Sequence, residues 1–277
     1  NHIKGLRHEK ISNCIRTIIY SYNYRHSTCL SVWSQCWLRN TSVDDTDGDI
    51  DTISISGKYY LNAVQEKGAP LAEAAFLNKA SNIGLGYINA SLDGADEDID
   101  AVGVAGEFFI PNSQFYVSGT INRTDVADEN GNGYSAEVGF LPINGLLLAV
   151  GVADQSESID PIQAAKYGFM TTFANAAIAT GEDDSTAATL RAKYVTQIGN
   201  HFANFEAHTY IGDETTYSLG ADLYLDPTLS IGASFADSTA DESETIFSVR
   251  AQKFFTPQVA VGVNYTTVDD IDSFGIN

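Results

Sequence analysis

The sequence is poor in basic residues, methionine and proline, and it contains no long apolar run. Only 15 of its 277 residues are Lys or Arg, against 36 Asp and Glu, so its formal charge is −21. A surface of this sign repels phosphate, which argues against a nucleic-acid partner. No stretch of about eighteen apolar residues occurs, which excludes a transmembrane helix. It does not exclude a membrane β-barrel, whose strands are short and alternate.

The residues that are abundant favour an all-β chain. Gly, Tyr and Phe number 23, 14 and 14, and several windows alternate apolar and polar residues with period two, notably 113–122, 216–225 and 258–267. Strands of nine to eleven residues with an apolar outer and a polar inner face are typical of outer-membrane barrels. A soluble β-sandwich with its apolar face inside shows the same alternation, so the alternation alone leaves both folds open.

The connections between these windows favour the barrel. Long acidic links alternate with short turns, as in a barrel with long loops at one end and tight turns at the other. The acidic links are 43–51, 93–100, 125–132, 154–160, 181–185, 212–215, 237–244 and 269–272. The short turns include 111–112, 142–145, 199–200, 226–228 and 256–257. We therefore predict a transmembrane antiparallel up-and-down β-barrel.

The expected number of strands is about sixteen, with fourteen as the alternative. A local duplication, in which residues 165–183 resemble residues 192–214, splits residues 162–180 into two strands. If that hairpin near 161–185 is not in the wall, the count falls to fourteen. The last residues, 273–277, begin another alternating strand that stops early. We therefore expect residues 41–277 to form one outer-membrane barrel that is truncated at its C-terminus.

The first forty residues differ in composition from the rest. They hold all three cysteines, both tryptophans and six of the fifteen Lys and Arg, with Glu9 as their one acid. The cysteine spacing fits no zinc pattern and no CxxC pair. Read one nucleotide later, Trp33 and Trp37 both become Gly, and the stretch between them can become Val-Asn-Val, an alternating strand. The upstream codons can then encode a secretory signal. We therefore predict that residues 1–40 are an out-of-frame translation without native structure.

One segment is not strand-like. Residues 70–80 are rich in helix formers and begin with proline, so we expect a short helix there, on the short-turn side. The segment could simply cap a turn, or it could act as a plug or gate at the periplasmic mouth. The gate candidates are Pro70, Leu71, Glu73, Phe76 and Leu77.

Alternation also assigns a set of charged residues to the polar, inward side, where water surrounds them and lipid does not. These candidates for lining a pore are Lys58, Glu107, Glu137, Lys166, Arg191, Lys193, Glu206, His208, Asp222 and Arg250. They could form a charged lumen that selects solutes by sign and size. They could instead form internal ion pairs, with Arg191, Lys193 and Arg250 pairing with Glu206 and Asp222. We expect a narrow lumen that combines both.

Catalysis, metals and cofactors have little support in the sequence. No GxSxG, HExxH or P-loop motif is present, so we predict that the chain is not an enzyme and has neither catalytic residues nor a cofactor. Residues 45–49 are similar to the start of a calcium loop, but Ile50 stands where that loop needs Gly and Ser56 where it needs Glu. No metal site is therefore predicted, beyond loose divalent bridging between the acidic loops and lipopolysaccharide.

Four segments together carry a family resemblance: Gly68–Leu77, Arg191–Thr196, Tyr217–Leu225 with Leu229–Gly232, and Phe254–Tyr265. Through them, residues from about 57 to 277 resemble the putative porin family of gammaproteobacteria, a group that includes an outer-membrane water-channel porin of Acinetobacter. The resemblance implies a single barrel, passive diffusion of small polar solutes and gating by inward elements. It assigns no ligand site to particular residues.

We therefore expect an outer-membrane porin of a Gram-negative bacterium, through which small polar solutes, water and ions diffuse passively along a narrow, charge-lined lumen. The alternative is a non-conducting structural or adhesive outer-membrane barrel that acts through its acidic surface loops. The expected partners are outer-membrane lipid, lipopolysaccharide and small polar solutes. A monomer is expected, with a trimer as the alternative. The sequence identifies neither the solute nor the ion preference.

Overall fold

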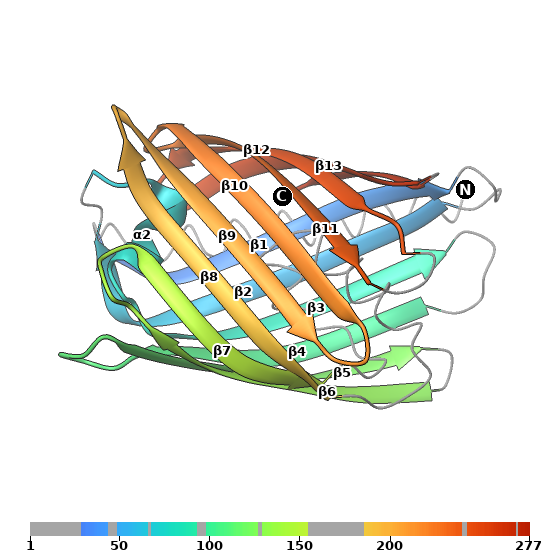
Figure 1. Ribbon diagram of the computed structural model, residues 1–277. Coiled ribbons are helices and arrows are strands. Elements are labelled where there is room, and N and C mark those ends of the chain that lie inside the picture. The colour runs from blue at the N-terminus through green and yellow to red at the C-terminus, as the bar shows by residue number, and fades with distance from the viewer. Residues whose placement is uncertain are drawn as a thin grey trace.

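Fourteen antiparallel strands form a closed barrel in the computed structural model (Figure 1). The structure describes residues 29–43, 49–65, 68–92, 98–126, 129–154, 186–239, 243–269 and 271–277. The first seven strands are β1 (Cys29–Val43), β2 (Asp49–Gln65), β3 (Asn82–Leu92), β4 (Asp98–Phe109), β5 (Phe115–Val126), β6 (Glu129–Phe140) and β7 (Leu146–Asp154). The others are β8 (Thr186–Ile198), β9 (His201–Ile211), β10 (Thr215–Asp226), β11 (Leu229–Ser238), β12 (Ile246–Thr256), β13 (Val259–Val268) and β14 (Ile271–Ile276).

The apolar face of the wall points outward. Leu85 and Ile121, for example, are 61% and 64% exposed, while the neighbouring inward residues Ile88, Ala101 and Thr120 are buried. Large exposed apolar side chains occur on nearly every strand, whereas a water-soluble sandwich would bury them. The structure therefore excludes the sandwich and fits a wall surrounded by hydrocarbon.

Each strand pairs with its neighbours in the chain, and β14 pairs with β1 to close the wall. Six residues of β14 pair with β13 on one side and with Leu38–Val43 of β1 on the other. Tight turns join β4 to β5, β6 to β7, β8 to β9, β10 to β11 and β12 to β13, and all of them lie at one end, which we call the short-turn end. The described acidic link 212–214 lies at the other end, where the strands that border the other acidic links also begin or end.

The strand number among the described residues is the smaller of the two that the sequence predicts. Strands β7 and β8 are direct neighbours, in register from Leu146 opposite Tyr194 to Asp154 opposite Thr186. The fourteen described strands thus close without a further member. The duplicated hairpin near 161–185 lies outside the described residues.

Part of the segment with unusual composition is described. Residues 29–40, which fall within the predicted out-of-frame segment, belong to β1 and pair with β2. Residues 1–28 lie outside the described residues. Positions 34 and 36 stand opposite Gly57 and Ile55 of β2. Both positions lie on the same side of β1 as Val32, which is exposed on the outward, lipid-facing side. In the shifted frame both can become Val, and valine fits a lipid-facing position better than Ser34 or Cys36.

The reading frame of residues 1–40 stays a prediction with a direct test. Sequencing the source DNA across codons 1–45 is expected to show a start codon, a secretory signal and an alternating strand in the frame one nucleotide later. If that frame holds no start codon and no signal, the chain as written is the native one. The barrel described here would then keep Trp33 as a native residue.

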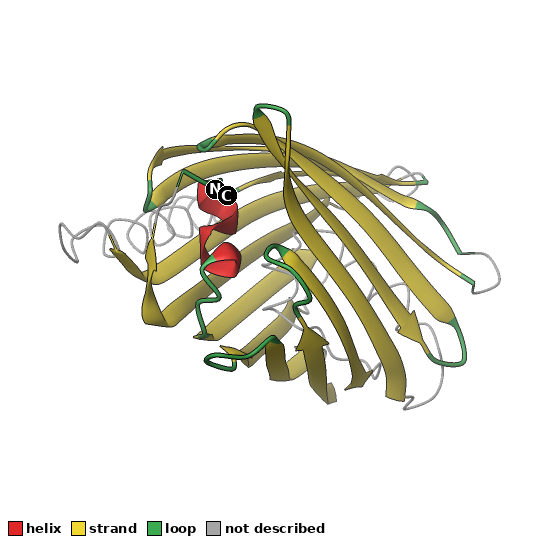
Figure 2. Cartoon of the chain, turned by 60° about the vertical axis from the view of Figure 1, so that its left-hand side comes forward, coloured by secondary structure: helices red, strands yellow, loops and turns green. Residues whose placement is uncertain are grey.

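Two short helical turns follow β2: η1 (Leu71–Glu73) and α2 (Ala74–Leu77), within the segment that the sequence predicts to be helical. They lie inside the mouth of the barrel at the short-turn end (Figure 2). Within the described residues, no helix is long and apolar enough to cross a membrane.

Candidate functional site

Residues 70–80, which we call the plug segment, extend from the β2–β3 side of the barrel to the opposite wall. The Glu73 carboxylate pairs with Lys193 of β8 and accepts a hydrogen bond from the Tyr224 hydroxyl of β10. The backbone N–H of Leu71 donates to the carbonyl oxygen of Pro227 in the β10–β11 turn, at 2.8 Å. In the strand order, β8 and β10 lie about halfway around the ring from β2 and β3. The plug segment therefore spans the lumen at the short-turn end.

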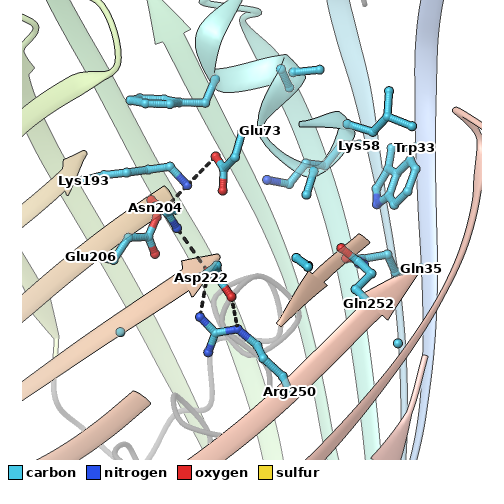
Figure 3. Close-up of a pocket in the computed structure, with 18 of the residues that line it drawn as sticks. Trp33, Gln35, Lys58, Glu73, Lys193, Asn204, Glu206, Asp222, Arg250 and Gln252 are labelled. Atoms are coloured by element: carbon cyan, nitrogen blue, oxygen red, sulfur yellow. Dashed lines mark hydrogen bonds and ion pairs between the residues drawn. The ribbon is translucent and has the colours of Figure 1, made fainter. Parts of the chain in front are cut away.

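A buried ion triad holds the plug segment to the wall (Figure 3). The Lys193 ammonium lies 2.8 Å from Glu73 Oε2 and 2.7 Å from Glu206 Oε1, and all three side chains are largely buried. It also lies 5.2 Å from the ring centre of Phe76, which adds a cation–π contact. Buried charges are stable only when they are paired. Lys193 therefore couples the plug segment to β9 through one side chain.

The turn that receives the plug segment is itself ordered by hydrogen bonds. The hydroxyl and the backbone N–H of Thr228 both donate to Asp226 Oδ1 at 2.6 Å. These bonds hold the pKa of the Asp226 carboxyl below its usual value. Lys253 donates to the Thr228 hydroxyl at 2.6 Å. The carbonyl group of Pro227 is thus presented by a fixed turn.

The root of the plug segment is apolar. Tyr60, Val64, Ala74 and Ala80 form one buried cluster between β2 and the helical turns, and Trp33 packs against it. Pro70 is fully buried. Because its root is packed and its tip is held by ions, the plug segment is anchored at both ends.

A second network of ion pairs and hydrogen bonds lines the lumen between β2 and β8. Lys58 pairs with Glu107 at 3.3 Å, and the Tyr116 hydroxyl donates to Glu107 at 3.0 Å. Arg191 donates to the same hydroxyl at 3.0 Å and forms an ion pair with Glu137. The network thus links β2, β4, β5, β6 and β8.

A third group lies on β9 to β12. Arg250 makes two hydrogen bonds to Asp222, at 2.7 and 2.8 Å, and its third contact is the Ser234 hydroxyl at 3.2 Å. Gly232 stands between them in the register, where a Cβ would clash with the Asp222 carboxylate and lie 3.0 Å from Arg250 Nε. The missing side chain of this inward glycine therefore leaves the space in which Asp222 and Arg250 pair.

The described lumen contains a cavity of about 350 Å³ next to the plug segment. Most of the predicted pore-lining residues face it, namely Lys58, Glu107, Arg191, Lys193, Glu206, His208, Asp222 and Arg250. Glu137 reaches it through Arg191, and Lys166 lies outside the described residues. Of the gate candidates, Leu71, Glu73 and Phe76 line the cavity, while Pro70 is buried and Leu77 lies near Gly145.

Two aspects of the site are absent from the sequence prediction. The sequence offers Glu206 and Asp222 as partners for Arg191, Lys193 and Arg250 as a group, and in the structure Lys193 pairs with Glu206, Arg250 with Asp222, and Arg191 with Glu137, which that group of acids does not include. Tyr116, which bonds to Glu107 and Arg191, and Tyr224, which bonds to Glu73, carry no sequence signal beyond their inward parity in alternating strands. Within the part of the chain that the structure describes, no group of three or more His, Cys, Asp or Glu side chains is placed to hold a metal ion.

Comparisons with known proteins agree with this architecture. The outer membrane protein Omp33 of Acinetobacter baumannii is 28% identical, covers 91% of this chain and 97% of its own, and superposes with a TM-score of 0.66. Other solved structures share under 25% identity, for example the following two. The KdgM porin is 9% identical, covers 88% of this chain and 95% of its own, and superposes with a TM-score of 0.42. Salmonella typhi OmpF in complex with daunomycin is 10% identical, covers 88% of this chain and 96% of its own, and superposes with a TM-score of 0.43. A search of the curated proteins finds no match.

The family model provides the assignment. The model described as "Putative general bacterial porin" matches residues 25–277, which is nearly the whole chain. Porins are channels, not enzymes, and they lie in the outer membrane of Gram-negative bacteria, in agreement with the outward apolar wall described above. The chain belongs to the general bacterial porin family that this model describes.

Proposed function

We propose that the barrel allows passive diffusion of small polar solutes, water and ions through a narrow, charge-lined lumen. The observation that carries the proposal is the character of the inward face, which bears charged and hydroxyl side chains around a cavity of about 350 Å³ instead of a packed apolar core. Polar groups on a pore wall replace part of the hydration shell of a passing solute. A cavity of this size restricts the solutes to small ones.

We further propose that the plug segment limits this diffusion from the periplasmic side. It crosses the lumen and is held by Lys193, Tyr224 and the carbonyl of Pro227. The gate candidates Pro70, Leu71, Glu73, Phe76 and Leu77 then have distinct roles. Pro70 is fully buried, Leu77 lies near Gly145 in the β6–β7 turn, and the ring centre of Phe76 lies 6.4 Å from that of Phe109. Glu73 and Leu71 fasten the tip.

The alternative, a non-conducting structural barrel, is supported by the ion pairing in the lumen. Four of the described bases on the lumen side, Lys58, Arg191, Lys193 and Arg250, pair with carboxylates. Side chains paired in this way can also fill the interior of a narrow barrel and leave no open path through it. In that case the acidic loops at the other end would be the working surface.

Single-channel recording in a planar bilayer separates the two functions. We expect the refolded protein to give small, discrete conductance steps in potassium chloride, which an empty bilayer lacks. We also expect the steps to change when Arg191, Lys193 and Arg250 are neutralised together. A folded barrel, recognised by its heat-modifiable mobility on gels, that gives no steps under any plug-segment variant would establish the structural alternative.

We propose that the functional unit is a monomer in lipid and lipopolysaccharide. Exposed apolar side chains occur on strands from β1 to β14, so the wall presents apolar surface to lipid around its circumference. Light scattering in detergent is expected to give the mass of one chain. A threefold larger mass would indicate a trimer.

A further inference from the structure

Four polar side chains lie in one cross-strand row on the lumen face of β9 to β13. Asn204 stands opposite Asp222, Asp222 opposite Gly232, Gly232 opposite Arg250, and Arg250 opposite Asn264. The four side chains all face the lumen cavity. Figure 3 shows three of them, Asn204, Asp222 and Arg250, joined across the space by dashed lines. We call these four side chains the amide row.

The charges of the amide row cancel. Arg250 and Asp222 form a two-point ion pair, and Asn204 Nδ2 donates to Asp222 Oδ2 at 3.3 Å. A guanidinium has five N–H donors, so the pair keeps hydrogen-bonding capacity although it is neutral as a unit. An ion approaching the row would find little net field to compensate the loss of its hydration shell.

The amides at both ends have unused hydrogen-bonding atoms. Asn264 is only 6% exposed, and neither its Oδ1 nor its Nδ2 is bonded to another residue that the structure describes. Asn204 is 4% exposed, and its Oδ1 likewise has no partner among the described residues. Buried polar atoms without partners are costly, so native proteins rarely leave them unbonded. The row therefore offers two acceptors and at least one donor toward the cavity.

We infer that the amide row is a contact site for small, uncharged, hydroxyl-rich solutes such as polyols. A hydroxyl group both donates and accepts, so neighbouring hydroxyls on one molecule match the mixed donors and acceptors of the row. The neutral ion pair favours such a molecule over a salt ion. The Ser234 hydroxyl, bonded to Arg250, adds a further group of the same type. This inference rests on the proposed porin function and names the solute class for it.

Entry of erythritol into liposomes that contain the refolded protein tests the inference. We expect the entry rate to saturate as erythritol concentration rises. The variant Asn264→Leu removes both unpartnered atoms at similar volume, and its entry rate should become linear and fall roughly threefold to tenfold at low concentration, as the loss of about one hydrogen bond implies. Asn200→Leu, in the exposed β8–β9 turn, is the matched control and should behave as the parent protein.

Potassium chloride conductance in the same preparations separates the possible failures. Conductance that is unchanged in Asn264→Leu, together with the loss of saturation, supports the amide row. Conductance with erythritol entry that never saturates, or that Asn264→Leu leaves unaltered, overturns the inference while the porin function stands. Absence of both fluxes overturns the proposed function and the inference with it. If Asn264→Leu does not fold, Asn204→Leu gives the same comparison.

Discussion

Replacement of Glu73 by Gln is expected to raise the mean single-channel current roughly tenfold or more. Lys193 keeps its ion pair with Glu206 at 2.7 Å, so the wall is undisturbed, whereas the plug segment loses its only ionic bond among the described contacts. A hydrogen bond to a charged group contributes about 1.5–3 kcal/mol, and about 1.4 kcal/mol changes a closed-to-open ratio tenfold. The plug segment should therefore leave the lumen for a larger fraction of the time.

The matched control for this experiment is Glu214→Gln. Glu214 is exposed in the link between β9 and β10, at the end of the barrel away from the plug segment. The substitution removes the same charge without touching the triad, so the current should stay at the parent level. Equal increases in both variants would mean that the total charge controls the current and that the Glu73 contact does not.

Replacement of Arg191 by Met is expected to lower the free energy of unfolding by about 3–5 kcal/mol. The side chain of Arg191 is only 6% exposed, and that of its partner Glu137 is 17% exposed. Without the guanidinium, Glu137 keeps, among the described contacts, the hydrogen bond from Ser118 at 2.9 Å, and the Tyr116 hydroxyl loses a donor. Urea unfolding of the refolded barrel, followed by far-ultraviolet circular dichroism of the strands, measures the change.

A double variant tests whether the cost comes from the unpaired charge. Arg191→Met combined with Glu137→Gln removes both charges and should recover most of the lost stability. The reason is that a buried ion pair contributes little net stability, whereas a single buried charge without its partner is strongly destabilising. If the double variant is as unstable as Arg191→Met alone, the packing of the Arg191 side chain against Tyr116, at 5.5 Å from the ring centre, is the dominant contribution.

Local patterns in the sequence predict the wall of this barrel well. Alternation with period two sets which side chain faces lipid, as at Ile121 and its buried neighbour Thr120. The lengths of the links separate the two ends. Helix formers after Pro70 predict the helical turns at Leu71–Leu77. Each of these features depends on a few consecutive residues, so the sequence alone can reveal it.

Contacts across the lumen are not local, and the sequence did not reveal them. The pairing of Glu73 with Lys193 joins residues far apart in the chain, and it depends on which way the plug segment folds from its turn. The pairing of Arg191 with Glu137 depends on the stagger between strands. Gly232 is a further example, because its role in leaving space for the Asp222–Arg250 pair depends on side chains of the neighbouring strands.

The most direct test of the plug segment is a reversible lock between its tip and the turn that receives it. The backbone N–H of Leu71 lies 2.8 Å from the carbonyl oxygen of Pro227, so cysteines at these two positions are close enough to be cross-linked. The experiment uses Leu71→Cys and Pro227→Cys together with Glu73→Gln, with Cys14, Cys29 and Cys36 replaced by Ser. Single-channel current is recorded before and after reduction. We expect a low current in the oxidised protein and a roughly tenfold or larger rise on reduction, as the freed plug segment leaves the lumen. An equal current in the two states, with the cross-link verified by mass, would show that the plug segment does not limit diffusion.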